Sequence, residues 1–166
     1  MRAANGPGMA SWDDVRRLAL AMPGASEKAS FGAASAWVVN QKGFVWVRPL
    51  RKSDLAALGP DAPTGEILGV RTPDLEMKEV LLARDPDVFF TTPHFDGYPA
   101  VLLQLDTISV ADLEDVIVEA WLARAPDKVV AAYLAGDTAR APRPKPATKK
   151  KATAKKKTAA KSKQKR

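Results

Sequence analysis

The sequence predicts an α+β domain in which helices pack on one face of a mostly antiparallel sheet, so that the fold is a two-layer sandwich. Three observations support this fold class. Helix-like and strand-like segments lack the regular alternation that a parallel sheet requires. Two strand-like segments flank a short polar turn, as in an antiparallel hairpin. Residues 11–138 are numerous enough for one core of two layers.

The first predicted element is an amphipathic helix that begins after Ser11. Ser11 is a suitable N-cap, and Asp14 at the third helical position can complete a capping box. The apolar positions that share one face of this helix are Val15, Leu18, Ala19 and Met22. Pro23-Gly24 ends the helix, and residues 24–31 are a candidate first strand.

A hairpin is predicted over residues 37–47. The segments 37–39 and 44–47 are β-branched and aromatic, and we interpret residues 40–43 between them as a four-residue loop. Most Trp and Phe side chains are expected in the core. Because helices cover only one face of the sheet, Phe44 or Trp46 is a candidate to cover the other face.

The middle of the chain predicts a strand, a helix and two further strands. Residues 66–70 are strand-like and follow a loop containing Pro and Gly. Thr72-Pro73 then opens a helix, with the threonine as N-cap and the proline at the first helical position, and this helix extends to about Arg84. Residues 88–91 and 100–105 are two strands on either side of a turn-rich loop.

The last predicted elements are helices. Ser109 with Asp112 caps a long helix. Its apolar stripe comprises Val110, Leu113, Val116, Ile117, Ala120 and Trp121. Ala125-Pro126 ends this helix, and a short helix follows to about Leu134.

The charged residues divide the chain into two parts of opposite sign. Residues 1–138 contain 13 Lys and Arg against 19 Asp and Glu, a net charge of −6, whereas residues 139–166 contain 13 Lys and Arg and no acidic residue. The second part also lacks Leu, Ile, Val and aromatic residues, so we predict a disordered basic tail over residues 139–166. Residues 1–10 contain Gly and Pro and are predicted to be a flexible leader. They lack the apolar stretch that a signal peptide needs.

Residues 89–102 (FFTTPHFDGYPAVL) strongly resemble the signature segment of the MmcQ/YjbR family. Shorter matches in the same order are DVRRLAL at 14–20, SFG at 30–32, KGF at 42–44 and AWLARAP at 120–126, so the resemblance extends from Trp12 to about Leu134. The resemblance implies a CyaY-like α+β fold and DNA binding by a double-wing arrangement of hairpins. It implies no catalytic residue.

One basic cluster within the predicted domain is a candidate for such a wing. It comprises Lys42 in the hairpin loop and Arg48, Arg51 and Lys52 just beyond the hairpin. The net charge of −6 opposes this hypothesis, because duplex binders usually present a basic surface to the phosphates. The alternative is that these four residues are solvated surface residues that bracket a turn.

The tail is the stronger electrostatic argument for a nucleic-acid partner. Its candidate phosphate contacts are Lys149, Lys150, Lys151, Lys155, Lys156, Lys157, Lys161, Lys163, Lys165 and Arg166. This Lys/Ala composition is similar to that of linker-histone tails, and lysine neutralises phosphates without reading bases. We therefore expect sequence-independent binding to DNA, with RNA as the alternative. A tail that only contacts any polyanion and keeps the protein soluble is a further alternative; a membrane partner is not expected.

The loop around His94 is the other candidate site. It carries Thr91, Thr92, His94, Asp96 and Tyr98. Three interpretations of these residues are open: they fix the path of the backbone, they contact a ligand or nucleic acid, or they take part in catalysis. Catalysis is the least favoured, because no nucleophile or second carboxylate is tied to His94 by a recognisable spacing. The absence of cysteine excludes disulfides and thiolate metal sites, and no metal or cofactor is expected.

These observations predict a non-enzymatic, cytoplasmic, nucleoid-associated DNA-binding protein in which the tail supplies most of the affinity. The alternative is a module that binds a protein or a small ligand through the His94 loop, with the tail only placing it near nucleic acid. An enzyme centred on His94 is the third hypothesis.

Overall fold

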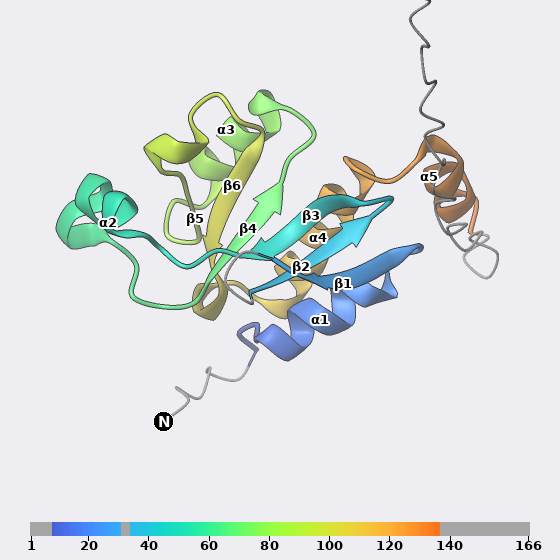
Figure 1. Ribbon diagram of the computed structural model, residues 1–166, viewed down its shortest axis with the longest axis horizontal. Coiled ribbons are helices and arrows are strands. Elements are labelled where there is room, and N and C mark those ends of the chain that lie inside the picture. Colours follow the sequence, from blue (N-terminus) through green and yellow to red (C-terminus); the bar gives the residue numbers. More distant parts are fainter. Residues whose placement is uncertain (1–7, 31–33, 137–166) are drawn as a thin grey trace, which may run out of the picture.

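The computed structural model describes residues 8–30 and 34–136. Within them a six-stranded, fully antiparallel sheet has the strand order β1-β2-β3-β4-β6-β5 (Figure 1). The strands are β1 Ala25–Ala29, β2 Ser35–Val39, β3 Lys42–Val47, β4 Ile67–Arg71, β5 Phe89–Phe90 and β6 Ala100–Gln104. The helices are α1 Trp12–Ala21, α2 Lys52–Leu58, α3 Leu75–Arg84, α4 Val110–Leu122 and α5 Asp127–Leu134. The predicted α+β fold is therefore confirmed; the predicted basic tail lies outside the described residues.

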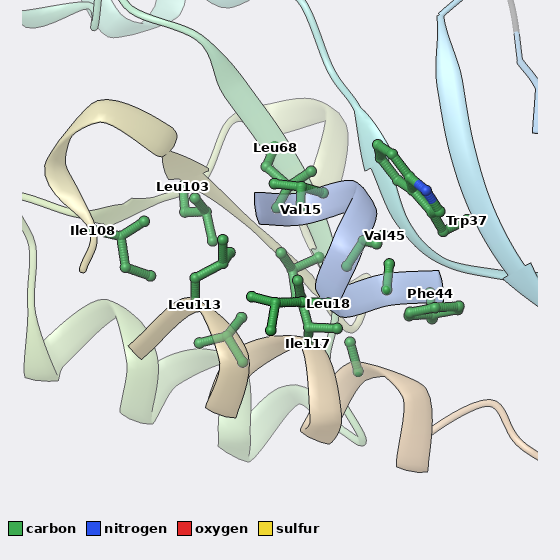
Figure 2. Close-up of a cluster of buried hydrophobic side chains, with 14 of the residues drawn as sticks. Val15, Leu18, Trp37, Phe44, Val45, Leu68, Leu103, Ile108, Leu113 and Ile117 are labelled. Carbon is green, nitrogen blue, oxygen red and sulfur yellow. The ribbon is translucent and has the colours of Figure 1, made fainter. Parts of the chain in front are cut away.

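The main core lies between one face of the sheet and helices α1, α3 and α4. Alternation along the strands sends Leu68 of β4 and Leu103 of β6 to this side. Val15 and Leu18 of α1 meet Leu113 and other side chains of α4 beneath these strands (Figure 2). Tyr133 of α5 packs against Trp121 at the end of α4, with ring centroids 5.0 Å apart. One layer of helices on one face of the sheet is the predicted arrangement.

Two of the three predicted helix caps are confirmed. The Ser11 hydroxyl accepts a hydrogen bond from the backbone N–H of Asp14, and the Asp14 carboxylate accepts one from the N–H of Ser11, which forms the predicted capping box. The Ser109 hydroxyl accepts from the N–H of Asp112 at 3.1 Å.

The prediction that Thr72 caps α3 is wrong, because Asp74 takes this role. The Asp74 carboxylate accepts from the N–H of Met77 at 2.8 Å. Thr72 instead extends the sheet, since its N–H donates to the Pro99 carbonyl at 3.0 Å. Its hydroxyl donates to the Asp74 carbonyl at 2.8 Å and steadies the turn before the helix.

The hairpin turn is shorter than predicted. Asn40 and Gln41 alone form the turn, both with positive φ (48° and 65°), and Lys42 already pairs with Val39. Positive φ at both central residues is the geometry of two-residue hairpin turns that match the twist of the strands. A four-residue loop is therefore wrong, and Lys42 is a strand residue.

An irregularity in β3 decides which side chains face the helices. The pairing passes from Val45 opposite Trp37 to Gly43 opposite Val38, so Phe44 is left without a partner, as in a β-bulge. Phe44 and Val45 both belong to the main core, whereas Trp46 belongs to a cluster on the opposite face. Of the two predicted candidates, Trp46 covers that face.

The opposite face carries a second, smaller apolar cluster. It comprises Ile67, Phe95, Ala100 and Leu102, with Trp46, Leu50 and Phe90 packed against it. Helix α2 lies beside this face, next to residues 93–95, in a segment where the sequence predicted only a loop. In the described part of the chain, no helix is both long and apolar enough to span a bilayer.

Candidate nucleic-acid interface

The second face of the sheet carries a groove of about 750 Å³ beside the smaller apolar cluster. The β2–β3 hairpin, the segment that follows β3, the end of β4 and the His94 loop contribute its walls. The lining residues are Ser30, Ala34, Ala36, Lys42, Gly43, Trp46, Val47, Arg48, Pro49, Leu50, Arg51, Arg71, His94, Phe95, Tyr98 and Arg124. The basic cluster and the His94 loop, which the sequence presents as separate candidates, therefore share one site.

The lining of the groove is positively charged. It includes five cationic residues, Lys42, Arg48, Arg51, Arg71 and Arg124, and no Asp or Glu from the described chain. This contrasts with helix α4, whose sequence contains Asp112, Glu114, Asp115 and Glu119. The net negative charge of residues 1–138 thus coexists with a local basic surface.

Arg48 differs from the other cations, because its charge is already compensated. It is buried, and its Nη2 donates to Asp54 Oδ2 at 2.9 Å. Its Nη1 donates to the Pro49 carbonyl, and its guanidinium carbon lies 5.4 Å from the centroid of the Phe95 ring. Arg48 is therefore neither a solvated residue nor a cation free to contact phosphate.

Asp54 ties helix α2 to the wall of the groove. Burial raises the pKa of Asp54, but the Arg51 N–H, which donates to its carboxylate at 2.8 Å, and the Arg48 guanidinium lower it by more. The pKa of Asp54 therefore lies below its usual value, and the carboxylate stays charged at neutral pH.

The remaining cations form no ion pair with a described residue. Salt bridges in the described chain involve Arg16 with Glu27, Arg17 with Asp14 and Arg48 with Asp54. Lys42, Arg51, Arg71 and Arg124 are absent from these pairs, and the buried Nε of Arg124 has no hydrogen-bond partner among the described residues. These four side chains can accept an anion without first breaking an ion pair.

Aromatic rings lie among these cations. Tyr98 is 45% exposed, and the Arg71 guanidinium carbon lies 4.1 Å from its ring centroid. The Trp46 ring packs against Gly69: a Cβ at that position would be 2.3 Å from Trp46 Cε2. His94 meets Phe95 edge to face at 5.0 Å. The groove therefore offers stacking surfaces as well as charge.

The His94 loop is held in place by a buried lysine. Lys78 of α3 is only 3% exposed, and its Nζ donates to the carbonyls of Phe95 at 2.6 Å and Tyr98 at 3.2 Å. Burial lowers the pKa of Lys78, while the charges of Asp96 and Glu79 oppose that shift. The fixed backbone path that the sequence suggested is thus present, but no hydrogen bond of the His94 or Asp96 side chain to a described residue maintains it.

The structure sorts the predicted site residues into two groups. Lys42, Arg48, Arg51, His94 and Tyr98 line the groove, whereas Lys52, Thr91, Thr92 and Asp96 do not. The ten tail residues from Lys149 to Arg166 lie outside the described residues.

Sequence reasoning missed Arg71, Arg124 and the anchor Lys78. Arg124 lies in the AWLARAP segment that carried part of the family resemblance, which was a usable signal. Lys78 stands three residues before the buried Leu81, so a lysine on the inner face of α3 could also have been noticed. Nothing in the sequence around Arg71 indicated its role.

The residues of the groove suit the binding of an anionic ligand. Within residues 8–30 and 34–136, no three His, Cys, Asp or Glu side chains come together in a way that could hold a metal ion. The His94 side chain makes a ring contact but no hydrogen bond to a described carboxylate that would orient it as a general base. Unpaired cations beside exposed rings suit a ligand that is both anionic and aromatic.

Comparisons with known proteins place these observations in context. The protein-family model described as YjbR matches residues 20–123. An uncharacterized protein of Mycobacterium tuberculosis (strain ATCC 25618 / H37Rv) is 51% identical over 130 residues, which cover 76% of this chain and 98% of the relative. An uncharacterized protein of Mycobacterium bovis matches equally well. The crystal structure of Deinococcus radiodurans protein DR2400, a DUF419 domain, has a TM-score of 0.52 and 18% identity over 72% of this chain and 80% of that one, which shows a shared fold.

Proposed function

This chain belongs to the YjbR family, and we propose that it is a non-enzymatic protein that binds nucleic acid through the groove and through its basic C-terminal segment. Binding is mainly to phosphates and is largely independent of sequence, with DNA as the leading partner and RNA as the alternative. This activity would place the protein in the cytoplasm, at the nucleoid.

The observation that carries this proposal is the composition of the groove. Lys42, Arg51, Arg71 and Arg124 come from four separate parts of the chain, yet they line one surface without a carboxylate among its described residues. Neutralising phosphates and releasing their counterions supplies most non-specific affinity for nucleic acids. A local basic surface of this kind is the expected footprint of such a protein even when the domain as a whole is acidic.

The C-terminal segment supports the same conclusion through its composition. Residues 139–166 carry 13 Lys and Arg and no acidic residue. If about half to three-quarters of these charges contact phosphates, the logarithm of the binding constant falls with the logarithm of the salt concentration with a slope of roughly −6 to −9. The four free groove cations alone would give a slope of at most about −4. The two contributions can therefore be measured separately.

A second candidate function is the binding of a small anionic ligand in the groove. Its volume of about 750 Å³ is within the range of small-molecule sites, roughly 300–1,000 Å³. The wall formed by the His94 loop is held by Lys78, as in a site formed before its ligand arrives. In this case the C-terminal segment would only place the domain near nucleic acid.

The test is a salt series of fluorescence anisotropy with one labelled DNA duplex and one RNA hairpin. The proteins are the full chain, a chain ending at Thr138, and versions of the shorter chain carrying Arg124→Gln or, as control, Lys128→Gln. The shorter chain is a suitable test protein, because 76% of this chain already matches 98% of the length of the mycobacterial relatives. Lys128 is an exposed cation outside the groove lining.

We expect the full chain to bind with a steep slope and the shorter chain to bind weakly with a shallow one. Arg124→Gln should weaken binding by the shorter chain, whereas Lys128→Gln should not. No binding of either nucleic acid by the full chain at low salt would refute the proposal. Equal effects of the two substitutions would show that the groove does not contribute to nucleic-acid binding.

A further inference from the structure

We propose that the groove receives an unpaired nucleotide, whose base stacks beside Tyr98 and whose phosphate is held by Arg51, Arg124 and Lys42. This inference rests on the proposed function and specifies its ligand: the groove would recognise an exposed base together with its phosphate, so a single strand would be preferred to a duplex.

The hairpin does not present a wing to a duplex. Its two turn residues, Asn40 and Gln41, are uncharged, and the Gln41 side chain already accepts a hydrogen bond from Lys28. Lys42 is at the start of β3 and lines the groove, and Arg48 is buried against Asp54. The cations that a wing would carry at its tip are instead gathered around the groove.

The groove contains an exposed aromatic ring with a cation against it. Tyr98 is 45% exposed, and Arg71 stacks on it with 4.1 Å between guanidinium carbon and ring centroid. An aromatic ring of this kind can stack with any base, because every base has a π face. In a duplex these faces are occupied by the neighbouring bases, so only an unpaired base can use the ring.

Cationic donors without an ion pair line the same groove as the Tyr98 ring. Arg51, Lys42 and Arg124 line the same groove as Tyr98 and take part in no ion pair with a described residue. The buried Nε of Arg124 also lacks a hydrogen-bond partner among the described residues. An anionic group that accepts from this N–H would satisfy a donor that is otherwise left unpaired at a cost.

The backbone that carries the Tyr98 ring is held in place before a ligand binds. Lys78 donates to the backbone carbonyl of Tyr98 itself and to that of Phe95. A backbone fixed by a buried side chain loses little conformational freedom on binding. The volume of about 750 Å³ suits one or two nucleotides rather than the full width of a duplex.

The experiment compares four probes with the full-length protein at about 0.15 M salt, at which interactions between exposed charges are partly screened. The probes are a fluorescein-labelled 12-nucleotide single strand, the same strand annealed to its complement, the same strand with abasic sites in place of its bases, and free AMP as a competitor. The proteins are the natural chain, Tyr98→Ala, Tyr98→Phe and, as a control beside the groove, Lys52→Gln.

We expect the natural chain to bind the single strand more tightly than the duplex or the abasic strand. Tyr98→Ala should weaken single-strand binding by about 5- to 150-fold, the range measured for loss of one base–aromatic stack, and should weaken duplex binding less. Tyr98→Phe keeps the ring, and Lys52→Gln lies outside the lining, so both should bind normally. Because Tyr98 is exposed, its replacement should not unfold the chain, which circular dichroism would verify.

The AMP arm distinguishes two sources of the same ligand chemistry. Displacement of the strand by AMP would support the proposal with a free nucleotide as occupant; no displacement, with the Tyr98→Ala effect intact, would support it with a strand. Equal losses on duplex, abasic strand and single strand, or no loss for Tyr98→Ala, would overturn it. A protein that binds none of the probes at low salt would instead refute the proposed function itself.

Discussion

Removal of the Asp54 carboxylate should be among the most damaging single changes at a polar residue of this domain. Asp54 is 2% exposed, and its Oδ2 accepts from Arg48 Nη2 at 2.9 Å and from the Arg51 N–H at 2.8 Å. Asp54→Ala leaves the buried Arg48 guanidinium without its counterion and the N-terminus of α2 without its cap. Breaking a buried pair in this way costs about 3–5 kcal/mol.

The assay is urea unfolding followed by tryptophan fluorescence, with Asp61→Ala as the matched control. Asp61 is an exposed aspartate in the turn after α2, and its loss should change the free energy of unfolding by less than about 0.5 kcal/mol. If Asp54→Ala and Asp61→Ala cost the same, the buried pair does not hold α2 against the sheet. The replacement of both partners, Arg48→Met with Asp54→Leu, should cost much less than Asp54→Ala alone.

The pH dependence provides an independent check on the same pair. The pKa of Asp54 is lowered in the folded protein from an ordinary value of 3.8. Its contribution to stability is therefore fully present above pH 3.8 and is lost as the pH falls through the lower, folded-state pKa. The difference in unfolding free energy between the natural chain and Asp54→Asn should shrink in that acidic range and stay constant from pH 5 to 8. A difference that stays constant down to pH 2 would contradict the assignment.

Three further changes test other parts of the structure. Gly69→Ala would place a Cβ 2.3 Å from Trp46 Cε2; we expect a cost of about 1–3 kcal/mol and an altered tryptophan spectrum, whereas an unchanged spectrum would mean that the ring does not lie there. Lys78→Met should cost about 2–4 kcal/mol at pH 7 by leaving two carbonyls unpaired. Burial lowers the pKa of Lys78 from 10.5. The difference in unfolding free energy between the natural chain and Lys78→Met should therefore grow as the pH rises towards 10.5. A difference that shrinks instead would contradict a buried ammonium. Ser11→Ala should lower thermal stability by about 1 kcal/mol through loss of its cap, and no loss would count against the observed capping box.

Features that depend on neighbouring residues in the chain were predictable. The Ser11 and Ser109 caps follow from a side chain and a backbone N–H three residues apart, and both are present. Thr72 and Asp74 can both cap a helix, so the local pattern was ambiguous. The hydrogen bond from Thr72 to Pro99, which continues the pairing of β4 with β6, decides for Asp74. That contact joins residues 27 positions apart, so local propensity cannot anticipate it.

The candidate site was predictable only in its parts. Lys42 and His94 were both singled out, but nothing in the chain between them indicates that they line one groove. The β3 bulge, which turns Trp46 towards this groove while Phe44 enters the core, arises from pairing with β2 and is not encoded in β3 alone. Helix α2 was missed because its most buried residue is Asp54 rather than an apolar stripe.

The sequence by itself determined the α+β class, the ends of two helices, the family and the separation of an acidic domain from a basic C-terminal segment, because periodicity, caps and composition are local or additive properties. Only the tertiary structure decided which cations are free. Arg48 forms an ion pair with Asp54, and Lys78 donates its hydrogen bonds to the His94 loop. Arg71 and Arg124 line the groove although they are far apart in the sequence. Burial and ion pairing depend on which residues meet in space, and they decide which of the charged residues can bind a ligand.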